Sequence, residues 1–329
     1  ANVLVCGGAG YIGSHMVEML IATKHKPVVL DNLIAGHRKA VPLDVPFVRG
    51  DISDIDLIGN TLDEFDIDVV MHFAAFLAVG ESVERPLKYY LNNVASTVIL
   101  LETMRIHGVR NFVFSSSAAV YGTPEVVPIP EIAPCAPINP YGRTKLMVEQ
   151  VLSDCRRGWG LRSTSLRYFN AAGASESGNI GEDHDPESHL IPLVLQVALG
   201  QREKILIFGD DYETRDGSCV RDYIHVDDLA IAHKRALEKL LDGHDGGSYN
   251  LGTGSGITVK EIINTCREVS GHDIPAEVAP RRDGDPPALV ADFAKATAEL
   301  DWKPERSNVR HIIETAWNWH KKHPNGYPD

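Results

Sequence analysis

The sequence predicts an α/β fold in which a doubly wound parallel sheet is joined to a smaller, mixed α/β C-terminal lobe. Short runs rich in Val, Ile and Phe alternate with longer amphipathic segments over the first half of the chain. These runs are continuously apolar, as expected for parallel strands covered by helices on both faces. A glycine-rich turn joins the first run to the first amphipathic segment, and the alternation ends near residue 170.

The predicted strands of the first half are short and apolar, at residues 3–6, 28–30, 47–48, 69–73 and 112–114. Helices are predicted where longer amphipathic segments occur, at residues 12–23, 86–107 and 141–156. Strand–helix–strand units cross over with a right hand, so these segments predict helices on both faces of one parallel sheet.

The second half has a different pattern. Residues 170–188 are rich in Gly, Ser and acidic residues, which favours a loop that acts as a lid or binding segment. Further helices are expected at residues 190–199, 227–241, 258–269 and 309–321. We therefore divide the chain into residues 1–170 and residues 171–329. Part of residues 227–251 is a candidate to return to the first domain.

Composition excludes several classes of protein. The 329 residues carry a formal net charge of −13, which argues against a nucleic-acid binder. No run approaches the roughly 18 apolar residues of a membrane span, and no leader is visible, so a cytoplasmic enzyme is expected. None of the fourteen histidines shows an HExxH or paired metal spacing, and no metal site is expected. The five cysteines lack CxxC spacing and are expected to be reduced thiols: Cys6, Cys135, Cys155, Cys219 and Cys266.

A glycine-rich loop opens the first predicted helix with Gly7, Gly10 and Gly13. Such glycines permit a tight turn and close approach of a pyrophosphate, whose charge the helix N-terminus stabilises. Asp31 ends the second predicted strand, where a carboxylate accepts ribose hydroxyls of NAD and repels the 2′-phosphate of NADP. Asp51 follows the third strand, in a position to meet the adenine. A turn without a ligand is the alternative, but together these features predict a Rossmann-type NAD-binding domain.

A second motif is the Tyr-x-x-x-Lys pair of Tyr141 and Lys145, whose spacing puts both side chains on one helix face. A phenol with a pKa of ~10 is a poor base, but a nearby ammonium and a cationic nicotinamide favour the phenolate. Ser115, Ser116 and Ser117 end a strand at the sheet edge where ligands bind. A surface tyrosine near a lysine is the alternative for the pair alone. With the serines and the glycine loop, it predicts a catalytic site.

With these motifs the sequence resembles the extended short-chain dehydrogenase/reductase family, and within it the UDP-glucose (UDP-galactose) 4-epimerases. The resemblance covers essentially the whole chain, through residues 7–13, 73–74, 79–82, 115–121, 141–145, 167–170, 189–192, 220–226 and 281–285. It implies an NAD-dependent isomerase of galactose metabolism that interconverts UDP-galactose and UDP-glucose. UDP-N-acetylhexosamines are further candidate substrates.

The resemblance also implies a mechanism. Tyr141 would take the proton of the sugar 4-hydroxyl while hydride passes from C4 to NAD⁺. The 4-keto sugar would then turn over and be reduced on its other face. Ser117 would hold the hydroxyl, and Lys145 would bind the nicotinamide ribose and lower the pKa of Tyr141.

The implied binding residues form two sets. The NAD contacts would come from Gly7, Gly10, Tyr11, Ile12, Gly13, Asp31, Asn32, Asp51, Ile52, Phe73, Ala74, Asn92, Ser115, Tyr141, Lys145 and Tyr168. The UDP-sugar contacts would come from Ser117, Tyr141, Asn170, His189, Leu190, Leu206, Phe208, Arg221, Arg282, Asp285 and Leu289. The two arginines suit a diphosphate, and Asp285 suits the uridine ribose. Surface ion pairs of the arginines with Asp222 and Asp283 are the alternative.

The chain departs from the family at two positions. Leu77 stands where the family often has a lysine that contacts the cofactor. Leu289 stands where the family varies between tyrosine and small residues, a position associated with admission of an N-acetyl group. The resemblance further implies a homodimer formed through the helices at residues 86–107 and 141–156.

Several alternatives differ in chemistry. A 4,6-dehydratase or a decarboxylase on the same fold would need acidic residues directly after Ser117, where this chain has Ala118 and Ala119. A uronate 4-epimerase stays open, because it needs only the shared triad and a carboxylate site. A net dehydrogenase would consume added NAD, and an NAD-sensing regulatory protein would not need the Tyr–Lys pair.

Overall fold

The computed structural model describes residues 1–282 and 284–328. Within that part, one parallel sheet holds seven strands in the order β11-β6-β5-β4-β1-β2-β3. Their bounds are Asn2–Cys6 for β1, Lys26–Asp31 for β2, Phe47–Arg49 for β3, Val69–His72 for β4, Asn111–Ser117 for β5, Arg162–Tyr168 for β6 and Gly246–Leu251 for β11. The strand order reverses at β1, so the crevice at the carboxyl ends of β1 and β4 is the expected ligand site. The predicted doubly wound α/β fold is confirmed.

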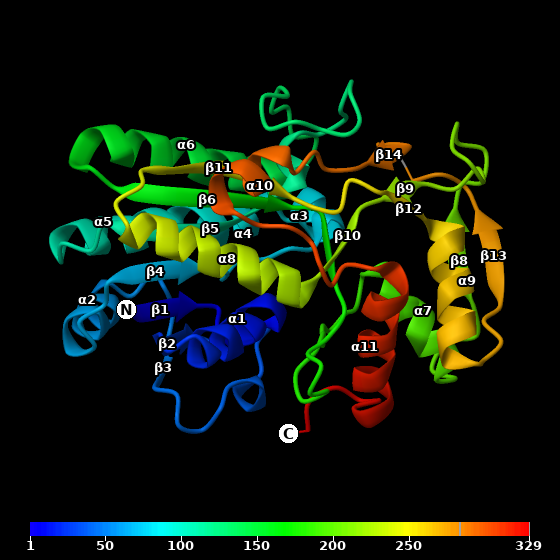
Figure 1. The fold of residues 1–329 in the computed structure, drawn as a ribbon, viewed down its shortest axis with the longest axis horizontal. Coiled ribbons are helices and arrows are strands. Elements are labelled where there is room, and N and C mark those ends of the chain that lie inside the picture. Colours follow the sequence, from blue (N-terminus) through cyan, green and yellow to red (C-terminus); the bar gives the residue numbers. More distant parts are fainter. Residues whose placement is uncertain (283, 329) are drawn as a thin grey trace.

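Helices cover both faces of this sheet. One face carries α1 (Tyr11–Ala22) and α8 (Val226–Leu241), which lie side by side in Figure 1. The other carries α2 (Ile55–Glu64), α5 (Ser96–Ile106) and α6 (Pro140–Trp159). Alternate residues of β1 enter different cores, Val3 and Val5 on the first face and Leu4 and Cys6 on the second. Burial on both faces explains why the strand is apolar without alternation.

The expected single helix at residues 86–107 is a chain of three helical pieces after the short helix α3 (Val79–Glu84). These are α4 (Pro86–Tyr89), the wider π-type turn η2 (Tyr90–Ala95) and α5. Asn93 in the π turn accepts a hydrogen bond from the N–H of Phe76 at 2.9 Å and donates to its carbonyl at 3.0 Å. Such turns often mark functional sites, and this one holds the loop that follows β4.

A smaller lobe follows β6. Its helices are α7 (Leu190–Ala198), α9 (Val259–Ser270) and α11 (Val309–Lys322), whereas α10 (Ala294–Leu300) packs against α8 and β11 on the large sheet. Short sheets pair β7 (Asn170–Ala172) with β10 (Tyr223–His225), β8 (Ile205–Phe208) with β13 (Ala276–Ala279), and β9 (Val220–Arg221) with β12 (Ile257–Thr258) and β14 (Ala288–Leu289). α8 and β11 pack on the large sheet, where β11 pairs with β6. The division into two domains at residue 170 stays a prediction.

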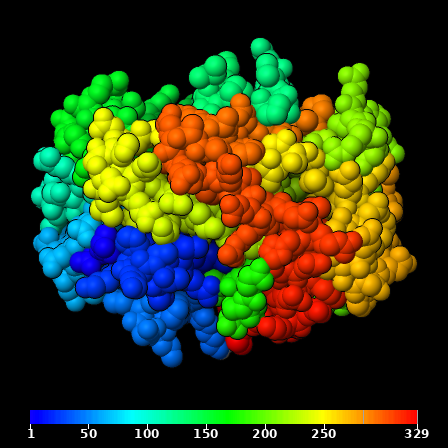
Figure 2. All heavy atoms as spheres, viewed as in Figure 1, coloured from blue at the N-terminus to red at the C-terminus, as the bar shows by residue number. Residues whose placement is uncertain are grey.

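The segment at residues 170–188 begins with β7 and is otherwise irregular. Far from lying free over the surface, it is packed, with Ile180 and Glu182 buried. The Trp319 indole of α11 donates to the Glu182 carbonyl at 3.0 Å, and Ser175 donates to Glu18 of α1 at 3.1 Å. In Figure 2 this green segment fills the space between the blue and red ends of the chain. No helix in the described part of the chain has the length and apolarity to span a membrane.

Candidate active site

The glycine-rich loop runs from the end of β1 into α1. Gly7 has a φ of +79°, and a Cβ there would lie 2.6 Å from the backbone nitrogen of Ala74. A Cβ on Gly13 would lie 2.1 Å from the carbonyl oxygen of Gly7, so helix and loop touch directly. At Gly10 the nearest atom would be 3.4 Å away, and this residue caps α1 without a side chain. The N-terminus of α1 is therefore open to a phosphate, which is the arrangement that a glycine-rich loop provides for the pyrophosphate of NAD.

The close packing of this loop gives a testable substitution. Gly13→Ala is expected to lower the free energy of unfolding by about 1–3 kcal/mol, because backbone must move to admit the methyl group, and to weaken NAD binding. Gly158→Ala in α6 is the matched control, since a Cβ there meets nothing within 4 Å, and it should stabilise by about 0.5–1 kcal/mol. Urea unfolding and NAD titration measure both effects. Equal effects of the two substitutions would contradict the account.

The predicted ribose and adenine residues lie at the ends of β2 and β3. Asp31 accepts hydrogen bonds from the N–H groups of Ala9 at 3.0 Å and Leu33 at 2.8 Å. Burial raises the pKa of its carboxyl, although those two donors lower it. Asn32 donates to Asp51 at 2.9 Å. The structure thus brings the three polar residues together beside the glycine loop, while the Ile52 side chain packs into the core below.

The loop after β4 faces the loop after β1. The N–H groups of Phe73 and Ala74 both donate to the Cys6 carbonyl, at 2.8 and 3.1 Å. Phe73 also packs against the core that contains Ile12. Tyr11 of the glycine loop donates its hydroxyl to the Gly173 carbonyl at 2.6 Å and so links the loop to the segment at residues 170–188.

The Ser–Tyr–Lys residues converge where β5 ends against α6. Asn139 caps α6 by accepting a hydrogen bond from the Gly142 N–H at 2.8 Å. Lys145 is buried; its Nζ donates to the Ser115 carbonyl at 2.7 Å and lies 5.7 Å from the Tyr141 ring centre. Ser117 lies close enough to Tyr141 to lower the pKa of its phenol. The three predicted catalytic side chains therefore form one group.

The electrostatics of this group differ from the expectation. Burial raises the pKa of Tyr141, although the hydrogen bond with Ser117 lowers it. Burial also lowers the pKa of Lys145 to about 7, against the opposing effect of the Glu149 carboxylate. Lys145 thus gives up charge in the same dry environment that Tyr141 occupies. In the chain alone, burial outweighs the effect of Ser117, and the pKa of Tyr141 lies above its usual value.

Burial of Lys145 predicts a pH-dependent stability. Its pKa falls from 10.5 to about 7 on folding, so between these values the unfolded chain binds more protons than the folded chain. The free energy of unfolding contributed by this lysine therefore increases as pH rises from 7 to 10. We compare the free energies of unfolding of the nucleotide-free chain and its Lys145→Met variant in urea. The stability of the wild type relative to the variant should increase as pH rises over this range. A difference independent of pH would contradict the shift.

Two further predicted cofactor residues lie beside the group. Tyr168 and Ser115 hydrogen-bond through their hydroxyls. Asn92 donates to Asn93 at 2.8 Å, so the π turn brings it to the loop after β4. Leu77, in the family's lysine position, is 39% exposed and supplies no charge.

The predicted UDP-sugar residues come from the smaller lobe. Arg221 forms an ion pair with Asp285 and donates to the Pro286 carbonyl at 3.0 Å. Its partner is thus Asp285, 64 residues away in the sequence, and not the neighbouring Asp222. Leu289 pairs in register with Arg221 across β14 and β9. Asp283, offered as the other surface partner, lies outside the described residues.

A second part of this lobe carries the remaining residues. The Arg282 guanidinium lies 3.8 Å from the Phe208 ring centre. Leu206 alternates with the buried residues of β8 and therefore shares a face with Phe208. Asn170 donates to the Asp222 carbonyl at 3.0 Å, which joins β7 to β10. His189 caps α7, and Leu190 is its first residue.

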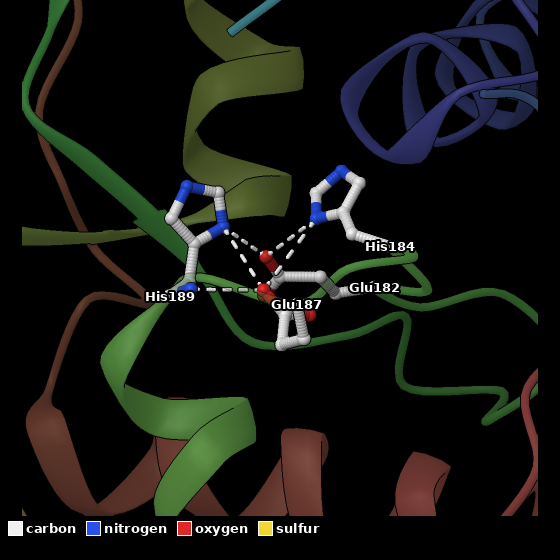
Figure 3. A group of neighbouring side chains, drawn as sticks. All are labelled: Glu182, His184, Glu187 and His189. Atoms are coloured by element: carbon white, nitrogen blue, oxygen red, sulfur yellow. Dashed lines mark hydrogen bonds and ion pairs between the residues drawn. The ribbon is translucent and has the colours of Figure 1, made fainter. Parts of the chain in front are cut away.

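The structure adds a group that the sequence analysis missed. Glu182, His184, Glu187 and His189 direct their side chains toward one another (Figure 3), with candidate ligand atoms all within 4.8 Å. Burial raises the pKa of Glu182, but the two histidines lower it further, so the pKa lies below its usual range. The Glu-x-His-x-x-Glu-x-His spacing was the available signal. Because this segment is neither helix nor strand, the spacing alone does not show that the four side chains meet.

The fold and the site define an NAD-dependent enzyme built on a Rossmann-type sheet. The chain belongs to the NAD dependent epimerase/dehydratase family, whose sequence pattern matches residues 3–252. This confirms the predicted family and cofactor.

Relatives named UDP-glucose 4-epimerase match the chain over nearly its whole length. The chain is 55% identical over 325 residues to the UDP-glucose 4-epimerase of Halalkalibacterium halodurans, covering 99% of this chain and 97% of that protein. A crystal structure of a UDP-glucose 4-epimerase matches with a TM-score of 0.98 at 52% identity, over 100% of both chains. The Bifidobacterium longum enzyme in complex with NAD⁺ and UDP matches with a TM-score of 0.94 at 41% identity, over 99% of this chain and 100% of that one.

Proposed function

We propose that this chain interconverts UDP-galactose and UDP-glucose by inverting the configuration at C4 of the sugar, as a step of galactose metabolism. The observation that carries the proposal is the convergence of Ser117, Tyr141 and Lys145 at the carboxyl end of β5. The group lies in the same row of strand ends as the glycine loop, where a doubly wound sheet binds its ligands. The names of the relatives support the same reaction.

The residues have distinct roles in this proposal. NAD, when bound at the glycine loop, supplies the oxidation of C4 and the later reduction of the 4-keto sugar on its opposite face. Tyr141 takes the proton of the 4-hydroxyl at its phenolic oxygen and returns it at the end. Ser117 holds that hydroxyl beside Tyr141, whose pKa it also lowers. Lys145 contacts the nicotinamide ribose, and its ammonium favours the phenolate when protonated.

Recognition of the UDP group is assigned to the smaller lobe. Arg221 and Arg282 provide planar, charged donors suited to a diphosphate. A chain of net charge −13 must gather such groups locally to bind an anion. Asp285 orients Arg221 through their ion pair and would also accept the uridine ribose hydroxyls.

A chromatographic assay tests this function. The purified chain is incubated with UDP-galactose without added NAD, and the nucleotide sugars are separated. A mixture rich in UDP-glucose, with no net reduction of NAD, is expected. Absence of conversion while NAD is bound would overturn the proposal. A parallel incubation with a UDP-uronate tests a uronate 4-epimerase, and Ala118 and Ala119 supply no acid or base for a dehydratase.

We also propose that Leu289 limits the use of UDP-N-acetylhexosamines. Leu289 packs against the cluster of Ala118, Val120, Tyr121 and Ile129, directly beyond Ser117. Leu289→Gly is expected to raise kcat/KM for UDP-N-acetylgalactosamine relative to UDP-galactose by about tenfold, and Leu289→Tyr is expected to lower this ratio. A change of a few methylene groups in a binding pocket alters discrimination between substrates by about this factor. Leu43→Gly is the control because Leu43 is 92% exposed on a distant loop. An unchanged ratio in both Leu289 variants would contradict this role.

We propose a homodimer formed through the outer face of the helices at residues 86–106 and α6. This face exposes Leu87, Leu91, Val98 and Met147, at 74%, 66%, 43% and 43%. Exposed apolar groups on neighbouring helices are typical of an interface. Light scattering of the purified chain should give twice the mass of one chain, and Leu91→Arg should reduce it. A wild-type mass of 36.1 kDa would contradict the dimer.

A further inference from the structure

We propose that Glu182, His184, Glu187 and His189 form a binding site for one divalent transition-metal ion, and that Zn²⁺ is the ion it suits best. These residues lie in the segment between β7 and α7, and His189 is the N-cap of α7. The site is separate from the Ser–Tyr–Lys group and does not depend on the proposed epimerase activity.

The four donor atoms lie within 4.8 Å of one another, so small side-chain shifts would bring them round one ion. The Nδ1 atom of His184 lies 3.2 Å from Oε1 of Glu182 and 3.8 Å from Oε1 of Glu187. The Nδ1 atom of His189 lies 3.8 Å from the same oxygen of Glu187. Ligands placed tetrahedrally at about 2.0–2.1 Å from Zn²⁺ lie about 3.3 Å from one another. His189 and Glu182 are closer than this, so binding of an ion would require the partly exposed imidazole of His189 to shift outward.

The donor set is the second argument. Two imidazole nitrogens and two carboxylate oxygens are ligands that Zn²⁺ takes in proteins. Both histidines present the same atom, Nδ1, toward the two carboxylates (Figure 3). The Nδ1 atom of His184 is buried and makes no hydrogen bond with a described residue, although Glu182 is within ion-pair distance. A buried polar atom without a hydrogen-bond partner calls for an explanation, and an ion held between this nitrogen and the carboxylates would supply one.

The surroundings fix the ligands from outside. Glu187 accepts hydrogen bonds from the N–H groups of Ser188 at 2.7 Å and His189 at 2.9 Å. The Trp319 indole holds the main chain of Glu182. The ring of His184 meets Tyr11 edge-on, with centroids 6.3 Å apart. Such contacts orient metal ligands in known sites.

Four protein ligands define the role of the ion. Structural zinc sites are closed by four residues, whereas catalytic sites keep a position for water. The ion would therefore hold residues 182–189 between α1, α7 and α11. This segment carries His189 and Leu190, two of the predicted UDP-sugar residues. A cluster of ion pairs with protonated imidazoles is the competing account, and it requires no metal.

Metal binding by matched variants separates these accounts. The chain, freed of metal and then dialysed against Zn²⁺, is analysed by elemental mass spectrometry. We expect about one Zn²⁺ per chain in the wild type and binding at least about 100-fold weaker in Glu182→Gln and His184→Gln, since even outer contacts change affinity 10–100-fold. His107→Gln is the control, because His107 makes a single 2.8 Å contact between Nδ1 and the Asp63 carboxylate. It should bind Zn²⁺ like the wild type.

A wild-type measurement keeps the proposal testable if a variant fails to fold. Co²⁺ added to the metal-free chain should give the intense visible absorption bands of four-coordinate Co²⁺, and Zn²⁺ should abolish them. Absence of these bands, or Zn²⁺ binding unchanged in the folded Glu182 and His184 variants, would overturn the site. Neither readout involves turnover, so failure of the metal proposal is distinguishable from failure of the proposed function.

Discussion

Tyr141→Phe is expected to lower kcat for UDP-galactose by about 10²–10⁴-fold, the usual contribution of a positioned acid–base group. The variant keeps the half-buried ring and removes only the phenolic oxygen, whose pKa Ser117 lowers. Fold and NAD binding should therefore persist. Steady-state kinetics with chromatographic detection, together with the nucleotide content of the purified variant, measure both.

Tyr249→Phe is the matched control for this result. Its hydroxyl is also hydrogen-bonded, to Glu299 at 2.8 Å, but it lies on the edge strand β11 away from the Ser–Tyr–Lys group. Its kcat should equal that of the wild type. A Tyr141→Phe variant that retains NAD and turns over like this control would exclude Tyr141 as the proton acceptor.

The largest stability effect is expected at the buried ion pair behind Lys145. Arg167 donates to Glu149 through Nε at 2.9 Å, and the two side chains are only 8% and 7% exposed. Ser116 also donates to Glu149. Arg167→Met would leave the carboxylate buried without its charge partner and should lower the free energy of unfolding by about 3–5 kcal/mol. Urea denaturation measures this loss.

Two comparisons test the cause of that loss. Arg105→Met breaks an exposed pair with Glu102, whose side chains are 46% and 56% exposed, and should cost no more than about 1 kcal/mol. Arg167→Met combined with Glu149→Met removes both charges and should recover most of the stability, since an apolar replacement of a buried pair is often neutral. A double variant as unstable as the single one would assign the loss to packing.

Local sequence signals predicted the fold well. Continuous apolar strands, amphipathic helices and the glycine turn are determined by neighbouring residues, and strands β1 to β5 follow them, whereas β6 and β11 were not predicted. The helix predicted at residues 141–156 is α6, which begins one residue earlier, at Pro140. The helix at residues 86–107 was predicted without its π turn, because that turn depends on Asn93 reaching a loop 17 residues earlier.

The site was predicted less completely, for a physical reason. Residues carried on regular elements, such as Tyr141 and Lys145, could be placed together from their spacing. The pairing of Arg221 with Asp285 depends on a loop that returns to β9, which no local signal encodes. Burial is equally invisible in a sequence, so the raised pKa of Tyr141 and the convergence of Glu182 with His184 were not foreseen. The assigned roles of the cofactor and substrate residues stay predictions.

The most direct test of the central claim follows the hydrogen on C4. UDP-galactose carrying deuterium at C4 is converted by the chain in ordinary water, and the UDP-glucose formed is examined by mass spectrometry and NMR. If C4 is oxidised and then reduced on its opposite face by the same bound NAD, the product keeps its deuterium at C4. Loss of deuterium to water, or product formed without inversion at C4, would contradict the account.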